Sequence, residues 1–187
     1  MDILLMGPPG AGKGTQGALL AEALGVPKFA TGDLLRDAVQ RGTPLGLQAK
    51  ELMEAGHLVS DELILGIVRE ELGKPAARNG VIFDGVVRTI PQAEGVERLL
   101  GEQGRRMDAV LFFDVSDDEI LTRLTRRLKI EQRADDDPQA VATRLRAYRK
   151  QTAPVLDWYE TRKLVRRIPA TGSVESIAER VRQSLGK

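Results

Sequence analysis

A glycine-rich run near the amino terminus has the composition of a phosphate-binding loop. The run Gly7–Thr15 reads Gly-Pro-Pro-Gly-Ala-Gly-Lys-Gly-Thr in the 187-residue chain. Glycines let several backbone N–H groups turn toward one anion, and a helix that starts there adds partial positive charge. Lys13 is expected to reach the outer phosphates of a nucleotide, although Gly14 separates it from Thr15, where the general pattern has Ser or Thr directly after Lys. The alternative is a turn without a ligand. The predicted loop residues are Gly10, Ala11, Gly12, Lys13, Gly14 and Thr15.

A carboxylate follows a short apolar run in the middle of the chain. Asp84 comes directly after Val81, Ile82 and Phe83. Proteins with a phosphate loop place such a carboxylate near the magnesium ion that accompanies the nucleotide. We therefore predict that Asp84 and the hydroxyl of Thr15 hold Mg²⁺, mainly through water. The alternative for Asp84 is a turn or a helix cap.

Arginine makes up most of the basic residues. The chain has 28 Lys and Arg against 27 Asp and Glu, for a net charge of +1. A guanidinium presents a planar fork of donors that suits phosphate, although arginine is also common on solvated surfaces. Arg123 and Arg127 are four residues apart and share one face of a predicted helix, where the alternative to phosphate binding is a solvated face.

The composition excludes several classes of protein. There is no cysteine and only one histidine, His57. Disulfides, thiolate zinc sites, a cysteine nucleophile and a histidine-rich metal cluster are therefore excluded. Balanced charge argues against binding to nucleic acid or to an anionic membrane, and no apolar run approaches the roughly 18 residues of a membrane span. We expect a cytoplasmic monomer with no nucleic-acid or membrane partner.

Short apolar segments alternate with longer segments of helical period. This alternation predicts an α/β fold in which helices cover both faces of a parallel sheet. Ligands of such sheets lie at the carboxyl ends of the strands, so the residues after Met6, Phe83 and Ile168 are candidates for a site. The predicted strands are residues 3–6, 28–30, 81–83, 109–113 and 164–168. The predicted helices begin near Lys13, Thr43-Pro44, Ser116, Asp137-Pro138 and Ser173.

The motifs, taken in order, resemble those of the adenylate kinase family. They are the Gly7–Thr15 loop, Ala30–Arg36, Phe83–Thr89 with Gln92, and Arg133–Asp136. The strand and helix alternation matches the family over the whole chain. The resemblance implies a P-loop NTPase-type three-layer fold with a five-stranded parallel sheet flanked by helices. It also implies an enzyme that moves the γ-phosphoryl group of ATP to AMP, with Mg²⁺, and gives two ADP.

The resemblance further implies which residues serve each nucleotide. For ATP, it implies the glycine-rich loop, the two arginines of one helix face and a backbone contact to the base. For AMP, it implies contacts to the base, the ribose and the phosphate. The implied ATP-binding residues are Gly10, Ala11, Gly12, Lys13, Gly14, Thr15, Arg123, Arg127 and Gly172. The implied AMP-binding residues are Thr31, Arg36, Met53, His57, Leu58, Val59, Gly85, Val86, Val87, Arg88, Gln92, Arg133 and Arg144. The implied catalytic residues are Lys13, Arg88, Arg123, Arg127, Arg133 and Arg144.

The sequence departs from the family pattern in two places. Val86-Val87 stands where the family usually has Phe-Pro, commonly with a cis peptide bond. A cis bond before a non-proline residue costs about 2.5–4 kcal/mol, so we expect a trans bond here and a re-aimed Arg88. The lid is short, and without cysteine it lacks the zinc of the family's long lid. One kinase domain, 1–187, is then expected. Its parts are a core (1–29, 60–125 and 138–187), an AMP-binding lobe (30–59) and a short lid (126–137).

Other functions stay open at this point. UMP/CMP kinases and GMP kinases are similar to this sequence, although Thr31, Thr89 and Gln92 together match the AMP form. A P-loop switch that hydrolyses nucleotide and signals through partners would leave Arg36 and Arg88 without a task. A binding-only relative is a third alternative, suggested by the departure from the family motif.

Overall fold

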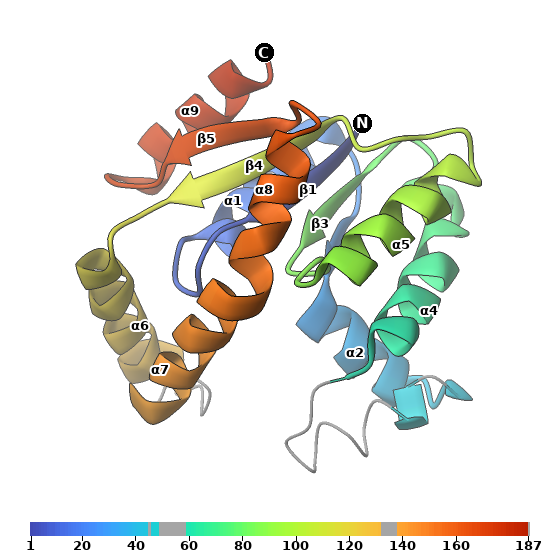
Figure 1. The fold of residues 1–187 in the computed structure, drawn as a ribbon, viewed down its shortest axis with the longest axis horizontal. Coiled ribbons are helices and arrows are strands. Elements are labelled where there is room, and N and C mark those ends of the chain that lie inside the picture. The colour runs from blue at the N-terminus through green and yellow to red at the C-terminus, as the bar shows by residue number, and fades with distance from the viewer. Residues whose placement is uncertain (45, 49–58, 132–137, 187) are drawn as a thin grey trace.

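A parallel sheet forms the centre of the chain, as a computed structural model shows (Figure 1). The structure describes residues 1–44, 46–48, 59–131 and 138–186. Within them the sheet has five strands in the order β2-β3-β1-β4-β5, and every neighbouring pair is parallel. The predicted fold class and its strands are thereby confirmed. The strands are β1 (Asp2–Met6), β2 (Lys28–Ala30), β3 (Val81–Asp84), β4 (Ala109–Asp114) and β5 (Val165–Pro169).

Helices cover both faces of this sheet. On one face, α1 (Lys13–Leu24) and α9 (Val174–Ser184) share a buried core with Ile3 and Leu5 of β1. On the other face, Leu4 and Met6 of β1 belong to a second core with α4 (Asp61–Leu72), α5 (Ile90–Gly101) and α8 (Ala153–Glu160). Successive residues of a strand point to opposite faces. The continuous apolar run of β1 is therefore the pattern of a strand that is buried on both sides.

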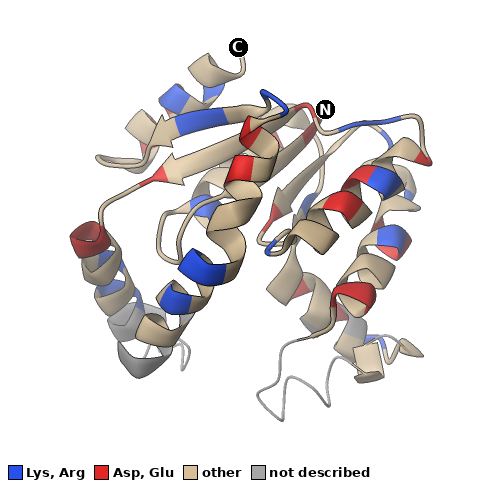
Figure 2. Ribbon diagram, in the orientation of Figure 1, with Lys and Arg blue, Asp and Glu red and all other residues tan. Residues whose placement is uncertain are grey.

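Further helices lie beyond the carboxyl edge of the sheet. There, α2 (Thr31–Gln40) lies on one side, and α6 (Asp117–Glu131) with α7 (Pro138–Ala147) lies on the other (Figure 1). A short 3-10 turn, η1 (Pro75–Ala77), leads toward β3. On α6, the first turn is acidic and basic residues follow it, so both charges occur on one helix (Figure 2). No helix of the described residues has the length and apolar character needed to cross a membrane.

Side-chain caps fix the starts of several helices. Ser116 Oγ accepts from Glu119 N (3.4 Å) and Ser173 Oγ accepts from Ser176 N (3.2 Å). An N-cap oxygen satisfies a backbone N–H that has no partner inside the helix. The helix starts predicted at Ser116 and Ser173 are confirmed.

The helix that begins at Pro138 changes its winding near Pro154. After α7, residues Tyr148–Thr152 form a wider π-helical turn, η3, which leads into α8. A proline ring lacks an N–H and clashes with the carbonyl four residues earlier. The wider turn lets the helix pass Pro154 and continue without ending. The sequence predicted a helix that begins near Asp137-Pro138 and did not predict this turn.

Candidate active site

The loop between β1 and α1 holds the ammonium group of its own lysine. Lys13 Nζ donates to the backbone oxygens of Gly7 (2.7 Å) and Pro8 (2.9 Å). The chain can fold this tightly because Gly12, with φ of +92°, precedes α1 in a left-handed conformation, and no side chain caps the helix there. Glycine is also required at Gly7, where an added Cβ would lie 2.8 Å from Phe113 O. The loop therefore brings an ammonium group and an uncapped helix N-terminus together, which is the composition of an anion site.

A carboxylate lies beside this loop at the end of β3. The side chain of Asp84 is only 13% exposed, and its Oδ2 lies 3.9 Å from Lys28 Nζ. An added Cβ at Gly14 would lie 3.7 Å from the same Oδ2, so the start of α1 passes close to the carboxylate. Burial raises the pKa of Asp84, and the positive charges of Lys13 and Lys28 oppose that rise. The structure brings the predicted metal residue and the predicted phosphate loop together.

Lys28 is a member of this site that the sequence did not single out. Its Nζ donates to Gly14 O (3.3 Å) as well as approaching Asp84. Lys28 is the first residue of β2, and its stem passes Gly17, whose added Cβ would lie 3.1 Å from Lys28 Cδ. The missing side chain at Gly17 is the one sequence signal for this approach. This glycine can be interpreted in that way only when α1 and β2 are known to be neighbours.

Arg123 joins the phosphate loop to the segment that follows the edge strand β5. Its Nη2 donates to Ala170 O (2.7 Å), its Nη1 approaches Ala11 O (3.5 Å), and its Nε donates to Glu119 Oε1 (2.7 Å). The residue comes from α6, whereas Ala170 follows β5. The structure thus brings Arg123 to the predicted ATP side. The guanidinium of Arg123 also connects the phosphate loop to the segment after β5, and the sequence did not predict this structural role.

The other predicted residues of the ATP side lie on α1, on α6 and after β5. Thr15 is exposed in the first turn of α1, and Arg127 is half-buried one helical turn after Arg123. Gly172, with φ of +101°, is exposed in the loop after β5. Arg180 holds that loop by donating to the backbone oxygens of Pro169 and Thr171, both at 2.7 Å. The sequence did not single out Arg180.

The carbonyl of Gly85 gathers the first residues of the predicted AMP side. Thr31 Oγ1 donates to Gly85 O at 2.7 Å, and Arg88 Nε donates to the same oxygen at 3.2 Å. Thr31 begins α2 and Arg88 lies in the segment between β3 and α5. Arg88 is exposed. The predicted proximity of Thr31, Gly85 and Arg88 is therefore observed.

The amide of Gln92 is bonded at both ends. Gln92 Oε1 accepts from the backbone N–H of Arg88 (2.7 Å), and Gln92 Nε2 donates to Asp61 Oδ1 (2.7 Å). Asp61 Oδ2 accepts from Thr89 Oγ1 (3.2 Å), and Thr89 Oγ1 in turn accepts from Gln92 N (3.3 Å). Gln92 is only 5% exposed. The sequence predicted Gln92 in this region and missed Asp61, whose place in α4 gives no indication of the contact.

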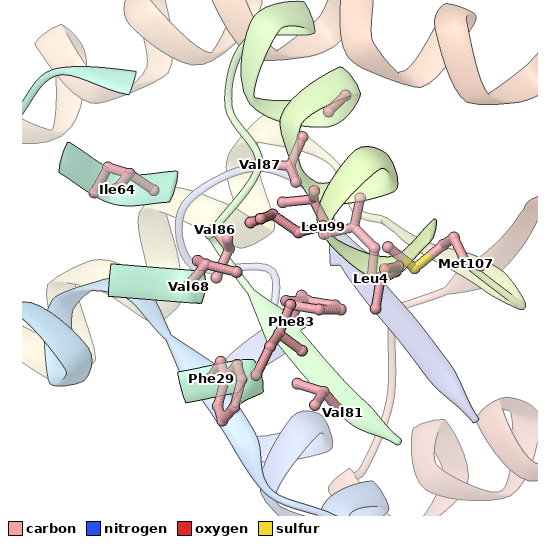
Figure 3. Close-up of a cluster of buried hydrophobic side chains, with 14 of the residues drawn as sticks. Leu4, Phe29, Ile64, Val68, Val81, Phe83, Val86, Val87, Leu99 and Met107 are labelled. Atoms are coloured by element: carbon pink, nitrogen blue, oxygen red, sulfur yellow. The ribbon is translucent and has the colours of Figure 1, made fainter. Parts of the chain in front are cut away.

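The side chains of Val86 and Val87 belong to the hydrophobic core. Both side chains are buried, at 1% and 3% exposure, in the core that α4 and α5 cover (Figure 3). The contact of these two residues with AMP, which the family resemblance implies, stays a prediction. The peptide bond between them is trans, as predicted.

Several predicted residues lie outside the described part of the chain. Met53, His57, Leu58 and Arg133 are among them. The helix positions of Arg36 and Arg144 are described, in α2 and α7, and their side chains are not. Val59 is described, and it packs against the core on the α4 side.

A hollow of about 640 Å³ lies at the opposite end of the strands. Its walls include Met107, which lies near the start of β4, and Leu164, which directly precedes β5. Nearby, Glu97 Oε1 and the Tyr159 hydroxyl are buried without a hydrogen-bond partner among the described residues. None of the predicted nucleotide residues that the structure describes lines this hollow, so its size alone does not make it the active site.

Comparison with known proteins identifies the family. A family model described as adenylate kinase matches residues 5–164. The chain is 47% identical to an adenylate kinase of Gemmatimonas aurantiaca, with 99% of each chain covered. It is 45% identical to an adenylate kinase of Thermus thermophilus, with 98% of this chain and 96% of the relative covered. It is 44% identical to one of Xanthomonas campestris over the full length of both. The chain therefore belongs to the adenylate kinase family.

Proposed function

We propose that the loops at the carboxyl edge of the sheet divide the work of phosphoryl transfer, with ATP on the Gly7–Thr15 loop and AMP on residues 85–92. The chain is a phosphotransferase that moves the γ-phosphoryl group of ATP to AMP and gives two ADP. An oxygen of the AMP phosphate forms the new bond to the γ-phosphorus. The bond from that phosphorus to the bridging oxygen of ADP breaks, so no covalent enzyme intermediate is required.

One observation carries this division. Strands β1 and β3 are neighbours, and their register pairs Leu5 with Asp84. The loops that leave these two strands therefore begin side by side. In-line transfer needs two nucleotides held with their phosphates adjacent, because positioning supplies much of the rate. Two adjacent loops at one sheet edge meet that requirement.

On the ATP side, Lys13 is proposed to exchange its carbonyl partners for the β- and γ-phosphates. Its Nζ already lies within the curve of the loop, at 2.7 Å from Gly7 O. Arg123 holds the loop against the segment after β5 through Ala11 and Ala170. Arg127, Arg133 and Arg144 are proposed to neutralise charge on the transferred group. That proposal for the three arginines rests on the family resemblance.

On the AMP side, Arg88 is proposed to bind the phosphate and Gln92 the base. Arg88 is exposed beside Gly85, and a guanidinium can bind phosphate with two parallel hydrogen bonds. Thr31, through its bond to Gly85 O, orders the same segment. Arg36, Met53, His57, Leu58 and Val59 are proposed to complete the AMP site, as the family resemblance implies.

The donor atoms beside the phosphate loop suit Mg²⁺. Magnesium binds through one or two carboxylates together with water and substrate phosphates, and Asp84 with the hydroxyl of Thr15 offers such hard oxygen atoms. Lys28 already balances the charge of Asp84, at 3.9 Å. When bound, the ion would neutralise phosphate charge.

We also propose that the enzyme works in the cytoplasm as a monomer.

A coupled assay of ADP formation tests the proposed function. ATP and AMP with Mg²⁺ should give two ADP, whereas UMP, CMP and GMP should be poor acceptors. ADP formation from UMP in preference to AMP would contradict the acceptor. ATP hydrolysis at an equal rate with and without any acceptor would support the P-loop switch in its place.

A further inference from the structure

We propose that Asp61 is a positioning residue that sets the orientation of the Gln92 amide and thereby favours adenine over 6-oxopurines in the acceptor. This inference rests on the proposed contact of Gln92 with the AMP base. Asp61 touches neither nucleotide in this proposal. It acts through Gln92, which lies 31 residues further along the chain.

The partners of the Gln92 amide determine which end is oxygen. Asp61 Oδ1 lies 2.7 Å from Nε2, and the Arg88 backbone N–H lies 2.7 Å from Oε1. A carboxylate can only accept and a backbone N–H can only donate. If the amide turned over, its oxygen would face a carboxylate and its N–H₂ group would face an N–H. Both contacts would be repulsive, so only one orientation is allowed.

Asp61 is itself held in place. Its second oxygen, Oδ2, accepts from Thr89 Oγ1 at 3.2 Å, and Thr89 caps α5, the helix that carries Gln92. Asp61 belongs to the first turn of α4, directly after the N-cap residue Ser60. The start of α4 and the start of α5 are thus joined through one carboxylate. Neither helix alone would fix the amide.

The locked amide keeps one N–H and one oxygen lone pair for a ligand. The edge of adenine offers an acceptor at N1 and donors at N6, which complement that pair. A 6-oxopurine has the reverse pattern, with a donor at N1 and an acceptor at O6. It would need the turned amide, which Asp61 and the Arg88 N–H oppose. Sites that hydrogen-bond a substrate reject an analogue that leaves their buried polar groups unpaired.

The experiment compares two acceptors on each enzyme variant. The ratio of kcat/KM for AMP to kcat/KM for IMP, a 6-oxopurine, is measured for the wild type, Asp61→Ala and Asp61→Asn. Removal of Asp61 leaves only the Arg88 N–H to resist the turned amide, so Asp61→Ala should lower the ratio by about tenfold. Asp61→Asn should lower it by a similar factor, because asparagine can present N–H₂ to the oxygen of a turned Gln92 amide. The matched control is Glu62→Gln, an exposed acid in the same helical turn, which should leave the ratio unchanged.

The ratio separates positioning from a purely structural role. A structural role in α4 would lower both values of kcat/KM in proportion, because loss of folded enzyme cancels in the ratio. An unchanged ratio in Asp61→Ala would overturn the inference. If Asp61→Ala does not fold, an unchanged ratio in Asp61→Asn with a wild-type KM for both acceptors has the same meaning.

A further variant tests the proposed contact of Gln92 with the base separately from the role of Asp61. Gln92→Ala should lose the preference for AMP over IMP. If Gln92→Ala keeps that preference, the proposed base contact is wrong. If Gln92→Ala loses the preference and Asp61→Ala keeps it, the base contact stands and only the role of Asp61 is wrong.

Discussion

The proposed ATP side and the proposed AMP side of the active site are built from different chemical groups. The ATP side is mostly backbone: Lys13 is held by the carbonyls of Gly7 and Pro8, and the helix N-terminus carries no side-chain cap. The AMP side is a network of side chains, in which Gln92 and its partners connect α4 to α5. Every nucleoside triphosphate has the same phosphates, so backbone N–H groups and an ammonium group can bind them whatever the base. Discrimination between bases requires oriented side-chain donors and acceptors.

Lys13 supplies the ammonium group of the proposed ATP side. The comparison therefore predicts that removing Lys13 causes the largest loss of activity. Lys13→Ala should lower kcat by about 10²–10³-fold, because it removes a preorganised positive charge at the transferred phosphates. The loss should be the same with AMP or IMP as acceptor. Steady-state kinetics with each acceptor measure it. A loss that differs between the two acceptors would contradict the separation of the two halves.

Arg88 tests the other half in the same way. Arg88→Ala should lower kcat/KM for AMP by about 10²-fold, through a missing charge-assisted contact to phosphate. The melting temperature should change little, since the side chain is exposed and its bond to Gly85 O is long, at 3.2 Å. The matched control is Arg98→Ala, an exposed arginine in the last turn of α5. A large loss of stability with normal turnover would give Arg88 a structural role.

Arg123 should show a smaller and mixed effect, because it connects loops. Arg123→Ala removes the bonds to Ala11 O and Ala170 O. We expect KM for ATP to rise about tenfold and the free energy of unfolding to fall by about 1–2 kcal/mol. KM for AMP should stay near the wild-type value. Kinetics with each substrate varied, together with chemical denaturation, measure both effects. An equal rise of both KM values would place Arg123 between the two nucleotides.

The two halves also differ in how much the sequence reveals. The phosphate loop is continuous, so its glycines and Lys13 predict it directly, and the strand before it and the helix after it are confirmed. Asp61 and Gln92 are 31 residues apart, and only the packing of α4 against α5 brings them together. Lys28 is similar, because its approach to Asp84 depends on which strands are neighbours. Local periodicity carries no information about such pairings.

Asp84 lies where the two halves meet, and it gives the smallest predicted effect. Burial raises the pKa of its carboxyl from the ordinary 3.8, against the charges of Lys13 and Lys28 on the ATP side and Arg88 on the AMP side. The fold therefore binds this proton more tightly than the unfolded chain does. Between pH 3.8 and the raised value, stability from this group is lost as the pH rises.

Asp84→Asn keeps the shape of the protonated carboxyl at every pH. Without Mg²⁺ it should increase the free energy of unfolding at pH 7 by on the order of 1 kcal/mol, which raises the melting temperature by about 2–4 °C. The gain should disappear as the pH falls toward 3.8, where the wild-type carboxyl is itself protonated. Thermal melts of both proteins between pH 4 and 8 measure this. If Asp84→Asn is less stable than the wild type at pH 7, the three positive charges outweigh burial. The ionised Asp84 would then link the proposed ATP and AMP sides without lowering the free energy of unfolding.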